Sequence, residues 1–477
     1  MTIGNLLPSR LARPLIAHSI ERRLVRGLII LTALLIPAVL GYMASIQQLK
    51  IVALLLAGVG ATIVLMRWPA LGIVFLGIVG MVFPSVGPSG LNLSMLLVAL
   101  LSVIWLFDMF VRRKEARLVA ARANWPLFAL VAVAIISFVV GQLNSFAFVQ
   151  HAPLGAQAGG LAIVILSAAA FFLVANLVSD LRWLKAITWA FLAYSVLEII
   201  VRILPASNAV LAPLVGGDFG SIFWIWLTAL AFAQAAFNYD LDPRWRVALG
   251  GIVIAALYIG LALSFRHKSL WLPQLVSLAA ILTFRSWRIG LVLVVVGVPV
   301  ALYGSSLILD SETYSASTRL DAFRIVADMV KGNPLFGVGF ANYYWNTPLY
   351  NIRGWNVEFS THNNYLDIVA QMGIFGLLAF LWFFGEVGRL GLRLRERVTD
   401  GFSRAYVYGS LGALVATLVT ATLADWVLPF FYNIGMYGFR TSVLVWLFLG
   451  GLVSLKHMTS ADKKAQGAHE RHQTEAV

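Results

Sequence analysis

The sequence contains no cysteine. A chain without thiols can form no disulfide, and it has no thiolate for nucleophilic catalysis or for metal binding. The His-Glu-x-x-His motif of zinc hydrolases is also missing, and only His151, His267 and His362 fall in segments expected on the outward side of the membrane. We therefore expect no metal site and no cofactor, and the polar part of the chain must hold its shape by packing and hydrogen bonds.

Charge is scarce as well. Only 12% of the 477 residues are charged, 60% are hydrophobic, and the mean hydropathy is +0.86. An average soluble domain is roughly half apolar and a quarter charged. Apolar runs recur along nearly the whole chain, and each can cross a hydrocarbon layer of roughly 30 Å as a helix. This composition excludes an ordinary soluble fold and predicts an all-α polytopic membrane protein surrounded by membrane lipid.

Polar breaks divide the apolar runs into about fourteen helices, or about twelve if the short runs at 51–66 and 268–284 are re-entrant. The expected helices are 27–46, 51–66, 69–86, 91–111, 125–142, 159–178, 183–203, 219–237, 246–264, 268–284, 287–309, 365–387, 405–424 and 437–455. The organisation is therefore a cytoplasmic tail (1–26), membrane helices (27–309), an outward loop (310–364), further membrane helices (365–455) and a disordered cytoplasmic tail (456–477).

The distribution of lysine and arginine sets the orientation. Most of the 35 basic residues fall in alternate loops, which are cytoplasmic by the positive-inside rule, so both termini are expected in the cytoplasm. The formal charge of +14 follows from this topology, and nucleic acid is not an expected partner. Seven basic residues between 266 and 440 break the pattern: Arg266, Lys268, Arg319, Arg324, Lys331, Arg353 and Arg440. The positive-inside rule does not account for positive charge on the side predicted to face outward, so these residues need another explanation.

The outward loop is expected to begin with an amphipathic helix. Thr318 and Asp321 fit a helix start, and Gly332-Asn333-Pro334 fits its end. Its apolar stripe repeats at helical spacing: Leu320, Phe323, Ala327 and Val330. Such a helix can lie among lipid headgroups with its arginines on phosphates, or it can present Arg319 and Arg324 to a ligand.

Aromatic residues follow this helix: Tyr343, Tyr344, Trp345, Tyr350, Trp355 and Phe359. They can stack on sugar rings, or they can form the aromatic belt of a membrane interface. His362 and Asn363 then lead into the next helix. A neutral imidazole suits the removal of a proton from a hydroxyl, and Glu358, one helical turn away, is a candidate to fix its tautomer. The alternative is an interfacial histidine that only caps the helix.

A second cationic feature is the tight turn at 263–268. Arg266, His267 and Lys268 stand together between two apolar runs, on the side predicted to face outward. Three potential cations there are unfavourable for orientation, so an anionic ligand such as phosphate or diphosphate explains them better.

Three segments together resemble the O-antigen ligase and polymerase superfamily of bacterial envelope glycosyltransferases. They are residues 262–268, the run STRLDAFRIVADMVKGNPLFGVGFANY from Ser317 to Tyr343, and THNNYLDIVAQMGIFGLLAF from Thr361 to Phe380. The resemblance implies a GT-C-like membrane enzyme of the bacterial inner membrane with a periplasmic catalytic loop. It also implies an inverting, metal-independent glycosyltransferase whose donor is a glycan on undecaprenyl diphosphate.

The resemblance also implies roles for particular residues. His362 takes the place of the family's essential histidine and presumed base, and Arg319 and Arg266 match the arginines that bind the donor diphosphate. Further candidates for binding the diphosphate or the substrate are Lys268, His267, Arg324, Asn363, Glu358 and Trp355. The acceptor is expected to be a growing glycan, as in a repeat-unit polymerase, or a lipid A core sugar, as in a ligase.

Two other classes compete with the enzyme. A transporter or a flippase of lipid-linked oligosaccharides should show internal repeats or ionisable residues near the membrane midplane, and neither is clear in this sequence. Glu198 and Arg202 are four residues apart and are expected to pair with each other. A purely structural scaffold would leave Arg266, Arg319 and His362 without a role.

Overall fold

The computed structural model describes residues 58–83, 87, 90–143, 150–211, 214, 215, 217, 219–399 and 401–475. The chain divides into two compact units, Met1–Arg67 and Trp68–Val477. In the first unit the described residues 58–67 are helical. The expected helix at 27–46 and residues 51–57 of the one at 51–66 lie outside the described residues.

The described part of the second unit is helical and has no strand, only an isolated bridge between Ile352 and Trp355. Its first helices are α3 (Pro69–Leu76), α4 (Val79–Val82), α5 (Leu93–Phe107, with a π-helical end at Asp108–Arg112), α6 (Asn124–Val140), α7 (Leu154–Leu177), α8 (Leu181–Ile203), α9 (Asn208–Leu211) and α10 (Ser221–Phe237). The others are α11 (Pro243–Tyr258, with a π-helical end at Ile259–Leu263), α12 (Lys268–Arg285), α13 (Trp287–Val330), α14 (Asn342–Asn346), α15 (Asn364–Arg395), α16 (Gly401–Leu423) and α17 (Phe439–Glu475).

Seven of the described helices are long and apolar enough to cross a membrane, and this confirms the expected polytopic membrane protein. They are Leu93–Arg112, Leu154–Leu177, Leu181–Ile203, Pro243–Leu263, Asn364–Arg395, Gly401–Leu423 and Met436–Ser460. Two shorter apolar helices, α6 and α10, accompany them. The count of fourteen spans stays a prediction.

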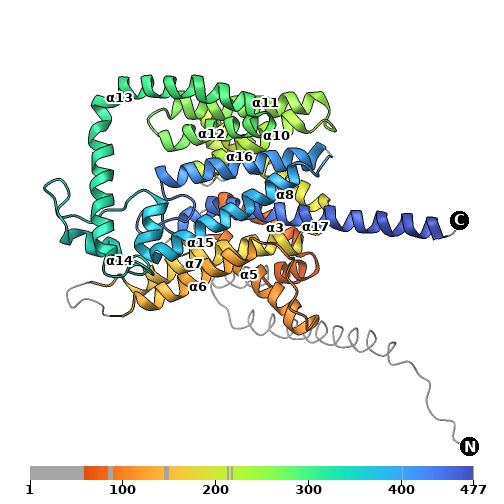
Figure 1. Ribbon diagram of the computed structural model, residues 1–477, viewed down its shortest axis with the longest axis horizontal. Coiled ribbons are helices and arrows are strands. Elements are labelled where there is room, and N and C mark those ends of the chain that lie inside the picture. Colours follow the sequence, from red (N-terminus) through yellow and green to blue (C-terminus); the bar gives the residue numbers. More distant parts are fainter. Residues whose placement is uncertain are drawn as a thin grey trace, which may run out of the picture. The chain divides into compact units, whose positions relative to one another are not determined.

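These helices run side by side (Figure 1). α10 packs against α11, α12 and α16, α17 against α7, and α15 against α6 and α16. Large aromatic side chains fill the centre: Trp226 of α10 stacks on Phe448 of α17 with ring centroids 5.0 Å apart, and both are buried. Nearer the edge, Glu198 and Arg202 form the expected ion pair, with Oε1 and Nε 2.7 Å apart.

The amphipathic helix is not a separate element. α13 continues from Trp287 to Val330, whereas the sequence suggested a membrane helix ending at 309 and a new start at Thr318. No proline or glycine stands between 305 and 318, so nothing interrupts the helical hydrogen bonds there. Figure 1 shows α13 bending from a course along the other helices to a course across their ends. Its end at Val330 agrees with the prediction.

The predicted apolar face of this helix differs from the buried face at three of its four positions, since Val330 alone is buried. Leu320 and Phe323 are 51% and 50% exposed, and Ala327 is exposed too. The buried stripe is the neighbouring one: Ala322, Ile325, Val326, Met329 and Val330. It packs on Tyr343, Ile352 and Phe430. Both stripes have helical spacing, so periodicity alone could not choose between them.

The C-terminal segment also differs from expectation. α17 continues to Glu475, although residues after Lys456 were expected to be disordered. Alanine, lysine, glutamine and glutamate are frequent there, and all are good helix formers.

A turn at 334–339 fixes the outward loop to α15. Gly373 has φ +64°, which breaks the helix and frees backbone groups for the turn. The Ile374 N–H donates to Pro334 O over 2.9 Å, and the Val338 N–H donates to Ala370 O over 2.8 Å. At Gly337, also at positive φ, a Cβ atom would lie 2.5 Å from Ala370 O, so only glycine fits. This glycine-rich turn is thus a structural anchor of the loop.

Candidate functional site

His362 stands in a left-handed conformation, with φ +48°, immediately before α15. This conformation is costly for a residue other than glycine. It is held by Asn363, whose Oδ1 caps the helix by accepting the N–H groups of Tyr365 and Leu366 over 2.9 and 3.2 Å. The Asn363 Nδ2 donates to Thr422 O over 3.2 Å. The exposed imidazole is therefore positioned by a residue that the sequence suggested for substrate binding.

The partner of the imidazole comes from the segment between α16 and α17. Asn433 Nδ2 lies 3.0 Å from His362 Nδ1 and donates to Asp425 Oδ1 over 2.6 Å. Glu358, the carboxylate proposed from the sequence, hydrogen bonds with Tyr344 instead. The carboxyl group linked to the ring is therefore that of Asp425, and sequence reasoning missed both Asp425 and Asn433.

Asn364 holds this segment against the start of α15. Its Oδ1 accepts the Val427 N–H over 2.9 Å, and its Nδ2 donates to Leu428 O over 2.7 Å. The side chain is fully buried, so both hydrogen bonds are shielded from water. Three consecutive polar residues thus have different roles. The His362 side chain is exposed at the surface, Asn363 caps the N-terminus of α15, and Asn364 holds the segment between α16 and α17 against that helix.

The carboxyl group of Asp425 is fully buried. Burial raises its pKa, while hydrogen bonds from the Phe430 N–H and from Asn433, and the charge of His362, act in the opposite direction. Its proton therefore matters for the ring. When Asp425 is ionised, the Asn433 amide donates to both neighbours, so Nδ1 accepts and the neutral ring carries its proton on Nε2.

When Asp425 is protonated, the amide can turn over. Its oxygen then accepts from the Asp425 hydroxyl and from the Nδ1–H of His362, which leaves a lone pair on Nε2. In this orientation alone the imidazole is a base at Nε2. The protonation of Asp425 and the tautomer of His362 are therefore linked through one amide.

A second, fully buried network lies beneath the ring. Asp367 Oδ1 accepts hydrogen bonds from the Tyr343 hydroxyl over 2.6 Å and from Thr361 Oγ1 over 2.7 Å. Tyr343 also stacks on Phe430, with ring centroids 4.6 Å apart. Burial and the neighbouring Asp367 hold the pKa of Tyr343 well above its usual value, so the phenol stays neutral. This network makes the backbone around His362 rigid.

Most of the aromatic set belongs to the interior of the loop. Tyr344 stacks on Tyr432 at 4.6 Å, and Trp345 Nε1 donates to the Tyr432 hydroxyl over 2.7 Å. Trp355 is 67% exposed. Of the aromatic side chains suggested for sugar stacking, Trp355 is the one the fold leaves most accessible.

The two arginines expected to bind a diphosphate are exposed. Among the described residues, neither Arg266 nor Arg319 has an ion pair or a hydrogen-bond partner. Arg324 lies 3.5 Å from Asp321, which also binds Arg353 Nε over 2.7 Å. Asp321 is thus paired with Arg324 and Arg353, and Arg319 remains available to bind an anionic ligand.

An aromatic pair holds the 263–268 turn against the first turn of α12. Phe265 stacks on Trp271, with centroids 5.7 Å apart and planes at 3°, and Trp271 Nε1 donates to Phe265 O over 2.9 Å. Arg266 and His267 are left exposed, and Lys268 is the first residue of α12.

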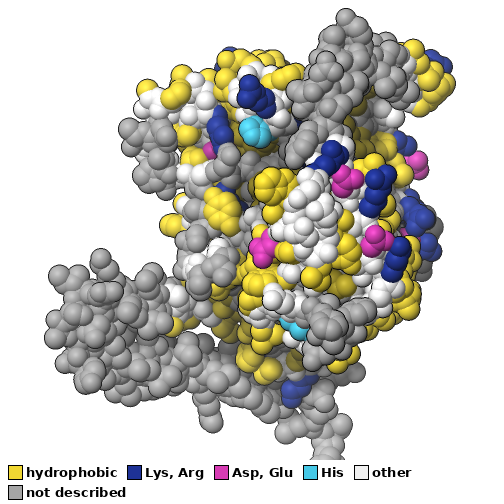
Figure 2. Space-filling model, turned by 90° about the vertical axis from the view of Figure 1, so that its left-hand side faces the viewer, with side chains coloured by type: hydrophobic (Ala, Val, Ile, Leu, Met, Phe, Trp, Pro, Cys, Tyr) yellow, Lys and Arg dark blue, Asp and Glu magenta, His cyan; other side chains and the backbone are white. Residues whose placement is uncertain are grey.

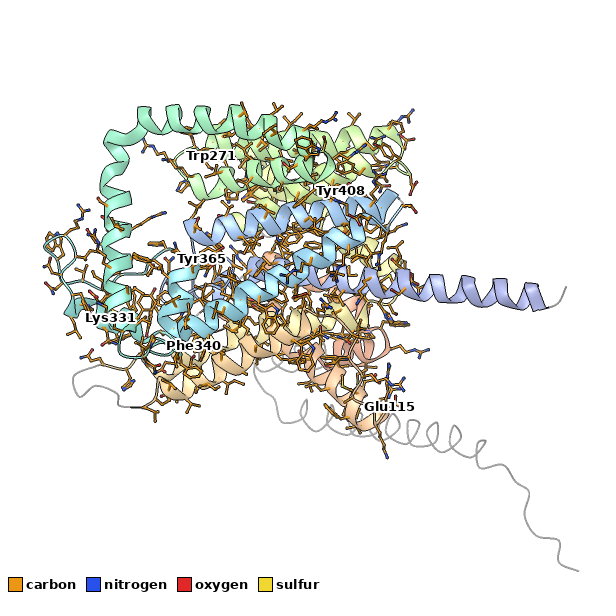
Figure 3. The ribbon with its side chains drawn as sticks, in the orientation of Figure 1. Glu115, Trp271, Lys331, Phe340, Tyr365 and Tyr408 are labelled. Atoms are coloured by element: carbon orange, nitrogen blue, oxygen red, sulfur yellow. The ribbon has the colours of Figure 1, made fainter. Side chains whose placement is uncertain are left out.

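The three parts of the site lie at one end of the helices. Figure 3 shows Trp271, Tyr365 and Lys331 toward the same end of the helices. In the sequence, Trp271 follows the cationic turn, Tyr365 follows His362, and Lys331 follows the second half of α13. Figure 2 views this end, where basic, acidic and hydrophobic side chains are interspersed. No hydrogen bond or ion pair between described residues joins Arg266 or Arg319 to the imidazole. Across the described residues, no three His, Asp or Glu side chains come together as a metal site requires.

No curated protein matches the sequence. A family model described as O-antigen ligase matches residues 219–381, from α10 into α15. The matched segment includes the 263–268 turn, the whole of α13 and His362, but neither Asp425 nor Asn433. This match supports a relationship of residues 219–381 to the superfamily of O-antigen ligases and polymerases.

Proposed function

We propose that the protein is an inverting glycosyltransferase of the bacterial inner membrane. It transfers a glycan from an undecaprenyl-diphosphate-linked donor to a sugar hydroxyl at the periplasmic face. The observation that supports this most is the placement of exposed Arg266, exposed Arg319 and His362 at one end of the helices, on segments within the family match. Both termini are then cytoplasmic, and the loop that includes Glu358 and Trp355 is periplasmic.

The arginines act on the leaving group. A diphosphate departs with growing negative charge, and guanidinium groups bind phosphate oxygens in a bidentate manner. Two of them directed at the departing diphosphate stabilise that charge without a metal ion. Lys268 and Arg324 add positive charge at the borders of the same region, and His267 lies beside Lys268. Purified enzyme should therefore remain active in excess chelator, and strict dependence on added Mg²⁺ would contradict this part of the proposal.

His362 acts on the acceptor. Its Nε2 removes the proton of the acceptor hydroxyl while the oxygen attacks the anomeric carbon, and the bond from that carbon to the diphosphate breaks with inversion. A positioned base of this kind contributes typically 10²–10⁴-fold. The base needs a free lone pair on Nε2, which is the arrangement with Asp425 protonated and the Asn433 oxygen toward the ring.

The acceptor distinguishes two versions of the proposal. A repeat-unit polymerase of O-antigen or exopolysaccharide is the first, because exposed Trp355 offers a stacking surface for a glycan acceptor. A ligase that attaches glycan to a lipid A core is the second, because the matching family model is described as O-antigen ligase.

Deletion of the protein separates the two versions. Loss of the glycan ladder with one repeat still attached to lipid A indicates a polymerase. Long chains retained on undecaprenyl diphosphate indicate a ligase. An unchanged pattern of lipid-linked and lipid A-linked glycans would overturn both versions.

A further inference from the structure

A cationic cavity lies at the other end of α15, far from His362. It has a volume of about 190 Å³ and is lined by residues 121–123 before α6, by the last turns of α15 and by Lys456 of α17. Figure 3 shows Glu115, from the loop that leads to residues 121–123, at the end of the helices opposite to Lys331. This end is the one predicted to be cytoplasmic.

The charges in this cavity are not balanced by carboxylates. Arg122, Arg393 and Arg397 line it and are exposed, and among the described residues none of their guanidinium groups has an ion pair or a hydrogen-bond partner. Lys456 Nζ donates to Ala120 O over 3.0 Å, which fixes a fourth cation at the wall. The acidic lining residue, Glu386, is bound to Arg389 Nη1 over 2.7 Å.

The positive-inside rule alone does not explain this arrangement. In the same loop, Arg112 and Arg113 pair with Asp108, and Arg117 pairs with Glu115. These arginines satisfy the rule for orientation while their charge is neutralised locally. Arg122, by contrast, faces two arginines from another helix across a cavity. The repulsion among these like charges is relieved when an anion binds between them.

The surroundings of the cavity are apolar. Trp125 and Phe128, which follow Arg122 in sequence, are exposed, Trp125 by 71%, and Leu392, the neighbour of Arg393, is exposed too. Tryptophan at such a position is typical of the boundary between headgroups and hydrocarbon. An anion that binds here therefore reaches the cations at the level where lipid phosphates lie, with apolar side chains available to its acyl chains.

We propose that this cavity binds the phosphate headgroup of an anionic phospholipid of the cytoplasmic leaflet. Basic pockets between membrane helices on this side are suited to such headgroups. The lipid bridges α6, α15 and α17, so it stabilises the packing of the helix that carries His362 at its opposite end. A soluble phosphate compound would use the same cations, but it would make no use of the apolar rim.

Purified protein in neutral detergent tests this proposal. Phosphatidylglycerol should raise the thermal unfolding temperature and remain bound in native mass spectra, whereas phosphatidylcholine should do neither. The double variant Arg393→Gln/Arg397→Gln should weaken phosphatidylglycerol binding by roughly 10- to 30-fold. The control is Arg288→Gln, which makes the same kind of substitution at an exposed arginine outside the cavity lining. It should leave phosphatidylglycerol binding unchanged.

Each other outcome contradicts the proposal. Equal stabilisation by both lipids means that no headgroup is selected. Equal protection by millimolar inorganic phosphate means that the site takes a soluble anion. Unchanged phosphatidylglycerol binding by the double variant means that the lipid binds elsewhere. The comparison of lipids needs only the wild-type protein, so it stands even if the double variant does not fold.

Discussion

One amide group joins the candidate base to a buried acid: Asn433 Nδ2 lies 3.0 Å from His362 Nδ1 and 2.6 Å from Asp425 Oδ1. The imidazole is exposed and the carboxyl group is buried, so the amide links a ring open to solvent to an acid that is shielded from it. In the proposed mechanism, protonation of Asp425 sets whether Nε2 donates or accepts.

Substitution of Asp425 tests this link. In Asp425→Asn, an amide N–H takes the place of the carboxyl O–H and donates to the Asn433 oxygen at every pH. We expect this variant to keep glycan transfer within about threefold of the wild type. Asp425→Ala should lose about 10- to 100-fold, because it leaves the Asn433 amide without its buried partner. Initial rates in membranes with matched protein levels measure both effects.

The pH dependence gives a second readout. Burial raises the pKa of Asp425 above its value of about 3.9 in an unfolded chain. Stability associated with the neutral carboxyl is complete below that value and is lost as the pH rises through the raised pKa of the folded protein. Transfer should decline in the same window, and Asp425→Asn should lack the decline. An identical alkaline limb in wild type and variant would assign it to another group.

Removal of the arginines should abolish transfer without loss of protein. Arg266→Ala and Arg319→Ala each remove a cation that we place on the departing diphosphate, so we expect rates lower by about 10²–10³-fold. Polymer formation and membrane abundance, measured in parallel, separate catalysis from folding. Lys331→Gln is the matched control, because this cation lies near Arg319 on the chain but pairs with Asp328 over 2.6 Å. Near-normal polymer from both arginine variants would defeat the assignment.

Loss of the imidazole should stop turnover and spare donor binding. His362→Ala keeps the arginines that grip the diphosphate, so purified variant should still retain lipid-linked donor. His457→Ala, an exposed histidine on α17, is the control and should behave as wild type. A variant at 362 that loses the donor yet still turns over would show that the ring binds substrate and is not the base.

The break in α15 should be sensitive to a single methyl group. A Cβ atom at Gly373 would lie 2.4 Å from the Leu335 carbonyl carbon and would also require a positive φ. We expect Gly373→Ala to destabilise the protein by about 2–4 kcal/mol. Gly385→Ala in the same helix meets nothing within 4 Å and should be neutral or stabilising by up to about 1 kcal/mol. Thermal unfolding in detergent compares the two, and equal unfolding temperatures would disprove the steric role of this position.

Local sequence signals were enough to locate most helices. The bounds expected for α7, α8, α10, α12 and α16 lie within a few residues of those observed, because apolar runs and charged breaks are properties of short segments. The N-terminal position of His362 relative to α15 was predictable for the same reason.

Features that depend on packing between distant segments could not be predicted from the sequence. The loop helix has two apolar stripes, and only contact with Tyr343 and Phe430 decides which one is buried. Asn433 is 71 residues from His362, so no local pattern connects them, whereas Glu358 was closer in sequence but binds Tyr344. Tyr343 was read as a surface aromatic and is fully buried.

The continuity of α13 ties substrate capture to the bilayer. Arg319 stands on the same helix as the apolar residues that begin at Trp287. If the first half of that helix lies in the bilayer and Arg319 binds the diphosphate as proposed, bilayer thickness becomes a mechanical input to the distance between Arg319 and His362.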